Sequence, residues 1–198
     1  MEVRELKTLR EILAPLLVAV AITAIFHATV ASFKVYGSSM YPSIAPGEYI
    51  IVSKASYFVK QPQRGEVIVF HSPRDPKTDL IKRVIAVPGD TIEIKSGTVF
   101  INDLAINEPY ISEPPKYDVY SQEIIDDNFF VLGDNRNNSS DSHGGWTVPH
   151  QYIVGKAWIT YWPPREWKTV KHYSLTASKQ AASKIKEFIA VIAQCPTK

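Results

Sequence analysis

The chain has 198 residues, and its 22 Lys and Arg against 20 Asp and Glu give a formal net charge of +2. This near-neutral balance excludes the charge excess typical of nucleic-acid-binding domains. A hydrophobic share of 45% with a mean hydropathy of −0.10 excludes both a disordered chain and a protein with many membrane spans. One cysteine, Cys195, excludes an internal disulfide framework and a cysteine-based zinc cluster.

Residues 12–33 contain no Asp, Glu, Lys or Arg. As a helix rising about 1.5 Å per residue they would extend roughly 33 Å, close to the roughly 30 Å hydrocarbon core of a bilayer. Three basic residues lie within 1–11, and Lys34 alone follows closely. The positive-inside rule then predicts a cytoplasmic N-terminus at 1–11, a transmembrane helix at 12–33 and an exported domain beyond it.

A cleaved secretory signal peptide is the alternative interpretation of this segment. Its apolar region is usually about 7–15 residues long and ends at small residues. Ala28, Ala31 and Ser32 supply small residues at the outer end. The uncharged stretch at 12–33 is longer than such a region, which favours the anchor.

After the anchor, short apolar or alternating runs predict β-strands. These runs cover residues 48–54, 66–70, 80–87, 91–95, 98–102, 128–132 and 156–162. Ser96-Gly97 lies between two of them and predicts a hairpin turn. Residues 107–127 contain three prolines and predict a loop or a small excursion from the sheet. We therefore expect a mainly β, antiparallel domain at 34–172.

The segment 173–198 has a different pattern. Ile185, Phe188, Ile189 and Ile192 recur at helical spacing among several lysines. The apolar stretch is too short to span a membrane. We expect a short amphipathic helical tail, which either packs on its own domain or lies on a lipid surface.

Three segments combine residue types that suit chemistry. The first is GSSMYPS at 37–43, a turn of small residues that exposes Ser39. The second is the strand 81–90, in which Lys82 stands among apolar neighbours. The third is the polar run GDNRNNSSDS at 133–142. Taken singly, they are also consistent with a turn serine, a surface lysine and a polar loop.

Taken together, the segments predict a serine–lysine hydrolase. A serine hydroxyl needs a base to accept its proton, and a lysine amine can serve. Lysine has an ordinary pKa near 10.4, so less than about 1% is neutral at pH 8. Burial among apolar side chains, without a carboxylate partner, lowers that pKa. A fall to about 8 corresponds to roughly 3 kcal/mol of differential desolvation, which the apolar neighbours of Lys82 could supply.

In this order, and behind an N-terminal anchor, the segments resemble the type I signal peptidases of bacteria and organelles. Ser39-Met40-Tyr41-Pro42 matches the Ser-Met-X-Pro motif of that family. The other matches are Arg64-Gly65-Glu66, Lys82-Arg83-Val84 with Pro88-Gly89-Asp90, and Gly133 to Arg136 followed by Asn138-Ser139 and Asp141-Ser142. The boxes spread over about residues 33 to 163, and their order makes the resemblance specific.

The resemblance implies roles for individual residues. Ser39 would be the nucleophile and Lys82 the general base, with Ser139 hydrogen-bonding and orienting the lysine amine. The Ser39 backbone N–H would donate to the oxyanion. Some relatives add a hydroxyl two residues before the nucleophile, but that position is Gly37 here, so the second donor stays unassigned.

Further roles are structural. Asp134, Arg136 and Asp141 would form the scaffold of the last box. Relatives often have Arg at the position of His143, where it pairs with the preceding aspartate, so the partner of Asp141 is open. The five histidines show no paired ligand spacing, and we expect neither a metal nor a cofactor.

The resemblance also implies a substrate. It predicts a membrane-anchored endopeptidase that cuts signal peptides from exported precursor proteins after small residues, at Ala-X-Ala sites. The extended substrate would add to the strand edge at 79–81. The positions expected at the substrate clefts, for which ordinary core packing is the alternative, are Val35, Met40, Ile44, Ile50, Val69, Leu80 and Ile81.

Other interpretations remain open at this point. One is a narrow-substrate peptidase of the conjugation or organelle inner-membrane type, and another is a non-catalytic, membrane-tethered β binding module. Self-cleaving repressors also use Ser and Lys, but the anchor replaces their DNA-binding domain. For the mechanism, His143 and Asp141 could form a Ser-His-Asp arrangement with Ser39. We expect a monomer whose domain faces outward from the cell (plasma or inner) membrane or lies on a thylakoid membrane, with the lipid bilayer and precursors as partners and no nucleic acid.

Overall fold

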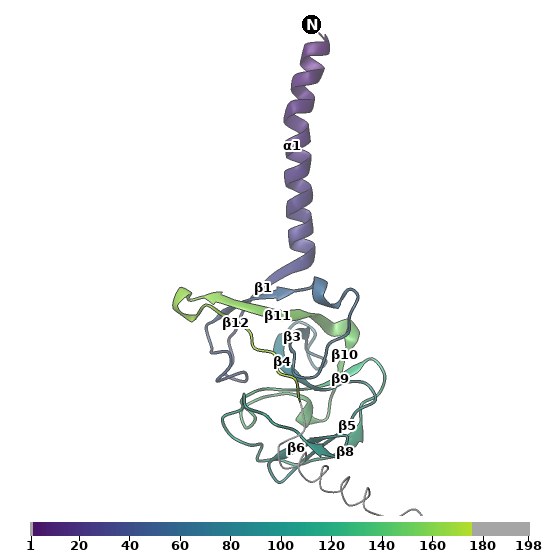
Figure 1. Ribbon diagram of the computed structural model, residues 1–198, viewed down its shortest axis with the longest axis vertical. Coiled ribbons are helices and arrows are strands. Elements are labelled where there is room, and N and C mark those ends of the chain that lie inside the picture. The colour runs from purple at the N-terminus through teal and green to yellow at the C-terminus, as the bar shows by residue number, and fades with distance from the viewer. Residues whose placement is uncertain (1, 176–198) are drawn as a thin grey trace, which may run out of the picture.

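The structure is a computed structural model that describes residues 2–175, with side chains from Arg10 onward. One long helix precedes a domain built from two β-sheets (Figure 1). The amphipathic pattern at 185–192 lies outside the described residues, so the expected tail helix remains a prediction.

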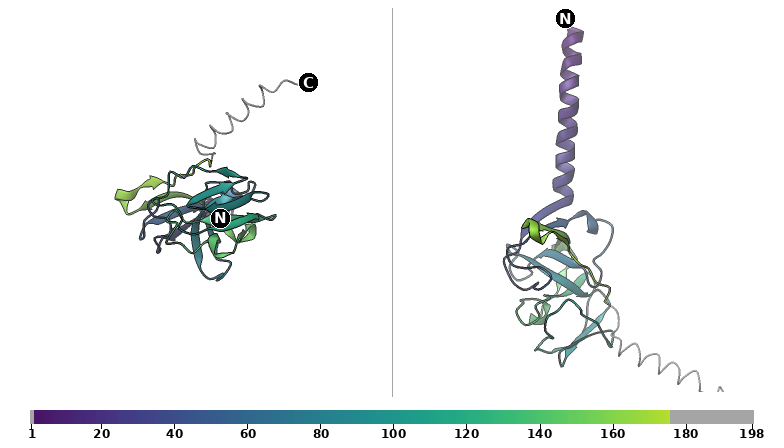
Figure 2. Two further views of the ribbon diagram at one scale, coloured as in Figure 1. Left: turned by 90° about the horizontal axis from the view of Figure 1, so that it is seen from below. Right: turned by 60° about the vertical axis from the view of Figure 1, so that its left-hand side comes forward.

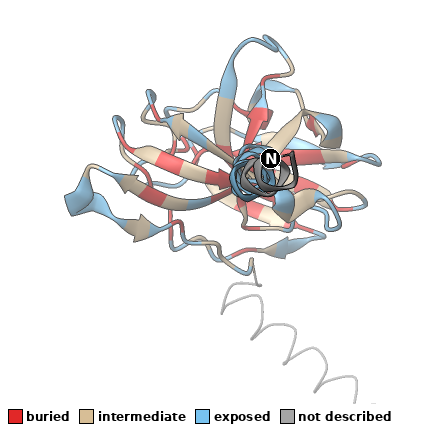
Figure 3. Ribbon diagram, turned by 90° about the horizontal axis from the view of Figure 1, so that it is seen from above, coloured by how far each residue is buried: buried red, intermediate tan, exposed pale blue. Residues whose placement is uncertain are grey.

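The helix α1 (Glu2–Thr29) projects away from the β domain (Figures 1 and 2). Its segment Arg10–Thr29 has a mean hydropathy of 2.2 and is long and apolar enough to cross a membrane. None of this segment is buried by the rest of the protein. Seen from above, along the helix, the described part of α1 is coloured as exposed, whereas the strands beneath it contain buried segments (Figure 3).

The predicted helical span 12–33 is wrong at its outer end. The helix ends at Thr29, and Val30–Lys34 forms strand β1, which pairs antiparallel with β2 (Tyr49–Ser53). An apolar sequence without charges suits either structure, so its composition could not locate the end of the helix. Pairing with β2 satisfies the backbone groups of β1 along one edge and packs Phe33 against the core of the domain.

Within residues 2–175 the larger sheet has eight strands in the order β1-β2-β11-β3-β4-β9-β10, and β12 pairs with β11. The remaining bounds are β3 Val67–His71, β4 Asp79–Ala86, β9 Asn128–Leu132, β10 Val148–Pro149, β11 Ile153–Trp162 and β12 Lys168–Thr169. Short 3-10 helices cover Ala55–Tyr57, Ser142–Gly144, His150–Tyr152 and Pro164–Glu166. The strand β4 lies between β3 and β9, which places its residues at the centre of the sheet.

The smaller sheet has the order β7-β6-β5-β8 and lies at the end of the domain farthest from α1 (Figure 1). Its strands are β5 Thr91–Lys95, β6 Thr98–Ile101, β7 Leu104–Ala105 and β8 Val119–Glu123. Ser96 and Gly97 have φ of 49° and 78°, which suits the expected hairpin turn between β5 and β6. The strand β8 lies in the predicted excursion 107–127 and is mostly exposed, so it carries no apolar alternation that predicts a strand.

All the strand pairs are antiparallel, which confirms the mainly β, antiparallel fold. Each of the seven predicted runs contains a strand. The strand β3 is buried on both faces: Val67 and Val69 join one apolar cluster, and Ile68 and Phe70 join another. This central position explains why β3 is apolar without alternation.

The domain extends beyond the expected boundary at residue 172. Tyr173 N–H donates to Gly65 O at 3.2 Å, and Leu175 packs against the core beside the smaller sheet. Gly65 has a φ of 84°, and a Cβ there would lie 1.6 Å from Tyr173 O. Only glycine allows the C-terminal segment to cross at this point.

Candidate active site

The loop that carries Ser39 follows β1 and is fixed from beneath. Met40 and Ile44 are fully buried in the apolar cluster under the loop. Backbone hydrogen bonds from Tyr41 N–H to Ser38 O at 3.0 Å and from Ile44 N–H to Met40 O at 2.9 Å close successive turns. Ser39 is therefore held at the surface of the domain by neighbours that point into the core.

Lys82 comes from the centre of β4, opposite Ile68 of β3. Only 3% of this lysine is exposed. Its Nζ donates hydrogen bonds to Ser39 Oγ at 2.8 Å and to Ile81 O at 2.9 Å. The fold thus brings a buried amine into contact with the serine hydroxyl across 43 positions of sequence.

Burial lowers the pKa of Lys82 from its ordinary 10.5 to about 8, while the charges of Asp141 and Asp134 oppose this shift. Desolvation dominates because the charged form of the amine loses its hydration inside the protein. Near pH 8 about half of the lysine is then neutral, so it can accept a proton.

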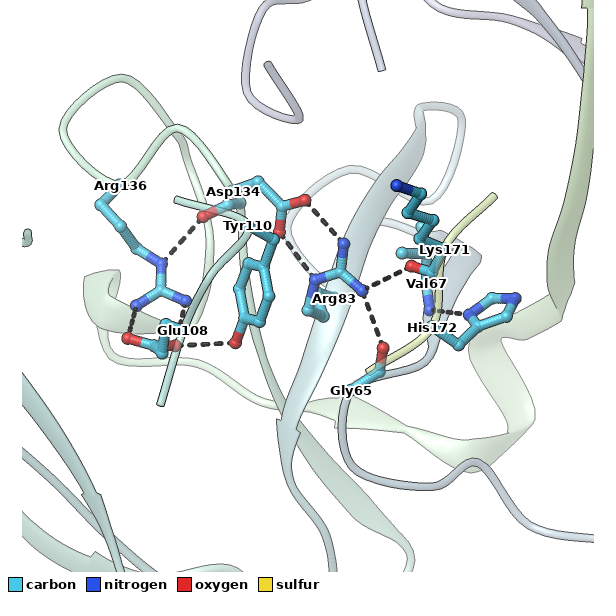
Figure 4. A network of polar contacts seen from close by, with 10 residues as sticks. Gly65, Val67, Arg83, Glu108, Tyr110, Asp134, Arg136, Lys171 and His172 are labelled. Carbon is cyan, nitrogen blue, oxygen red and sulfur yellow. Dashed lines mark hydrogen bonds and ion pairs between the residues drawn. The ribbon is translucent and has the colours of Figure 1, made fainter. Parts of the chain in front are cut away.

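Asp134 does not pair with Lys82, because Arg83 occupies it (Figure 4). Arg83 is fully buried, and its Nε and Nη2 donate to the two Asp134 carboxylate oxygens at 2.8 and 2.7 Å. Its Nη1 donates to Gly65 O at 2.8 Å and to Lys171 O at 3.0 Å. Asp134 therefore pairs with Arg83, the neighbour of Lys82 in the strand, and not with Lys82 itself.

Arg136 connects the segment 107–127 to the segment 133–142, which contains the last of the matched motifs. Its Nη1 and Nη2 donate to the Glu108 carboxylate at 2.8 and 2.6 Å, and its Nε donates to Gly133 O at 3.1 Å (Figure 4). Tyr110 donates to Glu108 at 2.8 Å, and its ring lies 4.2 Å from the Arg83 guanidinium. Glu108 and Tyr110, which lie outside the matched motifs, thus connect the two buried arginines.

Asp141 has a partner in this chain, although His143 stands where relatives often have the arginine that pairs with this aspartate. Its Oδ1 lies 2.7 Å from His143 Nδ1, and its Oδ2 accepts from Gly133 N–H at 2.9 Å. The His143 ring stacks on Tyr117 with ring centres 4.2 Å apart. Within the described part of the chain, the Ser39 hydroxyl is hydrogen-bonded to Lys82 and not to His143.

The expected hydrogen bond from Ser139 to Lys82 is absent from the described residues. Ser139 Oγ is buried without a hydrogen-bond partner. It packs over Gly133, where a Cβ would lie 2.3 Å from Ser139 Oγ and 2.5 Å from Ser39 O. The glycine lets the segment 133–142 approach the loop that carries Ser39, and the Ser139 side chain fills the space above the glycine.

A cleft of about 280 Å³ begins at Ser39 and Lys82. Five of the seven positions expected at the substrate clefts line it: Val35, Ile50, Val69, Leu80 and Ile81. Met40 and Ile44 lie outside its lining and form the core beneath the loop. Asp79 of the expected strand edge and Gly37 of the Ser39 segment also line it. The remaining lining residues were not expected at the cleft, because they lie in the predicted helix or are polar or exposed: Phe33, Lys34, Tyr36 and Thr78.

The cleft contains an open strand edge. On one side, β4 pairs with β3 along Asp79–Arg83. On the other, its pairing with β9 begins only at Arg83. In the described structure, residues 79–82 therefore have no strand partner on the second edge, which leaves their backbone available to an extended peptide.

Comparison with known proteins places this site in context. Residues 8–162 match the family model for signal peptidase, peptidase S26. The probable signal peptidase I-1 of Synechocystis sp. is 35% identical over 179 residues, which cover 86% of this chain and 91% of that protein.

Two further relatives are peptidases. The signal peptidase I of Leptolyngbya laminosa is 42% identical over 132 residues, covering 63% of this chain and 65% of that protein. The chloroplastic thylakoidal processing peptidase 1 of Arabidopsis thaliana is 33% identical over 157 residues, covering 74% of this chain and 46% of that protein.

We predict that Glu108→Gln destabilises the domain by about 3 kcal/mol, because it leaves Arg136 as a buried cation without its carboxylate. The exposed fractions of the two side chains are 7% for Glu108 and 0% for Arg136. Urea unfolding of the purified protein measures the change. Glu113→Gln is the matched control, since Glu113 lies in the same segment and pairs with Lys116 at an exposed site. Equal midpoints for the two variants would contradict the structural role of the buried pair.

Proposed function

We propose that the chain, which belongs to the signal peptidase family S26, cleaves its substrates with Ser39 as nucleophile and Lys82 as general base. The chain is a signal peptidase I protease, and enzymes of this kind act on secreted precursors that carry signal peptides. The observation that carries the proposed mechanism is the 2.8 Å contact between Lys82 Nζ and Ser39 Oγ in a buried setting.

In the proposed reaction, the neutral Lys82 amine accepts the proton of Ser39 as Oγ attacks the scissile carbonyl carbon. The Ser39 N–H stabilises the negative charge that develops on the carbonyl oxygen. The protonated lysine then donates its proton to the leaving amine, which is the new N-terminus of the mature protein. Water attacks the acyl-enzyme with Lys82 again as the base, which frees the signal peptide carboxylate and restores Ser39.

The surroundings of the lysine favour this assignment over a Ser-His-Asp arrangement. His143 Nδ1 contacts Asp141 as the base of such a triad would, but among the described residues its ring makes no hydrogen bond to Ser39, whose Oγ is bonded to Lys82 Nζ at 2.8 Å. Arg83 takes up the charge of Asp134, so Lys82 keeps a lowered pKa. A lysine base can then work at the mildly alkaline pH that its pKa allows.

The substrate-binding proposal rests on the cleft and the open strand edge. An extended signal peptide would add to residues 79–82 as an extra strand, with alternate side chains directed into the cleft. Val69, Ile50 and Ile81 give this cleft apolar walls. Subsites within it would take alanine-sized side chains at the first and third positions before the cut, as the resemblance to type I signal peptidases implies.

The proposed topology places the catalytic domain on the outer face of the membrane. The chain is a membrane-anchored protein, as its apolar helix and its bacterial and thylakoidal relatives indicate together. The basic residues before the span favour an N-terminus in the cytoplasm, or in the stroma for a thylakoid membrane. The open edge and the cleft would then meet precursors that emerge across the same bilayer.

We predict that activity rises with pH through a midpoint near 8, because the neutral form of Lys82 is the active one. Lys82→Ala and Ser39→Ala should each lower kcat/KM by at least about 1,000-fold. Lys82→Arg should fail as well, since a guanidinium does not release its proton in a protein. Cleavage of a purified precursor across a pH series measures these effects.

His143→Ala is the control for the identity of the base. It should keep the midpoint near 8, with some loss of stability because Asp141 loses its partner. A histidine base would instead give a midpoint near its ordinary pKa of about 6.5. An inactive His143→Ala beside an active Lys82→Ala would assign the chemistry to histidine.

Substrate selection provides a second prediction. Replacing the alanine just before the cut by leucine or phenylalanine should lower kcat/KM by more than about 100-fold, because a subsite that fits an alanine methyl group has no room for the larger side chain. The same replacements at the middle position of Ala-X-Ala serve as controls, since that side chain points away from the cleft. Equal cleavage of both substrate series would refute the assigned cleft.

Topology is tested by protease protection in sealed cells or vesicles. Protease added outside should digest the domain beyond residue 34, while a tag placed before Arg10 stays intact until the membrane is permeabilised. Digestion of the tag from outside would reverse the orientation. A mature chain that begins near residue 32 would replace the anchor with a cleaved leader.

A further inference from the structure

Two peptide units meet at Ser39, and Asn135 donates a hydrogen bond to the carbonyl of each. Its side-chain Nδ2 donates to Ser38 O at 3.2 Å. Its backbone N–H donates to Ser39 O at 2.8 Å. One residue of the last box thus holds the backbone on both sides of the proposed nucleophile.

The contact of the Asn135 side chain with Ser38 O fixes the direction in which the Ser39 N–H points. The carbonyl of Ser38 and the N–H of Ser39 belong to one trans peptide unit, so they point in opposite directions. A donor that fixes the carbonyl therefore also fixes the N–H. Among residues 2–175 the Ser39 N–H has no acceptor, so it is available to a substrate oxygen.

The same contact affects the strength of the donor. A hydrogen bond to a peptide carbonyl polarises the unit and strengthens its N–H as a donor. Tyr41 N–H already donates to Ser38 O at 3.0 Å, and the Asn135 amide adds a second bond to that oxygen. Gly37 supplies no side-chain hydroxyl near the nucleophile, so this backbone donor must carry more of the stabilisation.

We propose that Asn135 is a positioning residue for oxyanion binding, whose side-chain amide orients the Ser39 N–H toward the scissile carbonyl oxygen. This inference rests on the proposed Ser39–Lys82 function. It assigns Asn135 to the step in which negative charge develops, where a preorganised donor lowers the barrier most. Asn135 acts through the peptide unit and does not itself touch the substrate.

Two neighbouring asparagines supply matched controls. Asn138 Nδ2 donates to Ser38 Oγ at 3.0 Å, so it contacts the same serine but not the peptide unit. Asn137 Nδ2 donates to Pro114 O at 3.0 Å, away from the nucleophile loop. The three side chains carry the same amide within four positions of the sequence and differ in what they hold.

Kinetics of purified variants test the proposal. Asn135→Ala and Asn135→Asp should lower kcat by about 10- to 100-fold, somewhat less than the loss of a direct oxyanion donor. KM and the pH midpoint near 8 should stay unchanged, because the Asn135 side chain contacts neither the cleft nor Lys82. Asn138→Ala and Asn137→Ala should keep kcat within about 3-fold of the parent, a change of less than 1 kcal/mol.

A binding measurement separates positioning from a general loss of structure. A peptide aldehyde with an Ala-X-Ala sequence adds the Ser39 hydroxyl across its carbonyl. The Oγ–C bond forms, the hydroxyl proton ends on the former carbonyl oxygen, and no group leaves. The matching peptide alcohol fills the same cleft but has no carbonyl at the cut. In Asn135→Ala, the affinity for the aldehyde should fall by the same factor as kcat, and the affinity for the alcohol should not change.

Several outcomes would overturn the inference. These are an unchanged kcat in Asn135→Ala, an equal loss of affinity for the aldehyde and the alcohol, and an equal loss of kcat in Asn138→Ala. Failure of the underlying mechanism looks different. A Ser39→Ala enzyme that still cleaves the precursor would refute the proposed nucleophile, whatever the Asn135 variants do.

Discussion

The rest of the site depends on a lysine that is buried without a carboxylate in direct contact. Lys82 and Arg83 are adjacent on β4, and both are buried. Alternation along a strand directs them to opposite faces, so one reaches Ser39 and the other reaches Asp134. Because the arginine takes both oxygens of that carboxylate, desolvation can dominate the pKa of the lysine.

The surrounding contacts give the nearby carboxylates partners other than Lys82. Asp141 is hydrogen-bonded to His143 Nδ1 and to Gly133 N–H, and Glu108 pairs with Arg136. Buried pairs of this kind add little net stability, because desolvation offsets their attraction, but the loss of one partner is costly. Here these pairs occupy the nearby carboxylates. Among the described side chains, Lys82 is thereby left as a buried cation without a carboxylate partner.

The site was predictable from sequence to the extent that its residues lie in contiguous motifs. Ser39 and Lys82 could be identified together, and the structure brings them into contact. The Ser139 side chain was expected at Lys82 but packs over Gly133, since a rotamer depends on local space rather than on the motif. Met40 is apolar like the cleft residues, yet it is core, because apolarity alone does not tell which side of a loop faces solvent.

The sequence by itself determined the apolar anchor, the seven strand-forming runs, the antiparallel fold class and the order of the functional segments, because each follows from local composition and spacing. The tertiary structure decided where α1 ends, since pairing with β2 converts Val30–Lys34 into a strand. It also decided which cation meets which carboxylate, and it placed Asn135 against the carbonyls on both sides of Ser39. These features depend on groups far apart in the chain that come within hydrogen-bonding distance only when the strands pair and water is excluded.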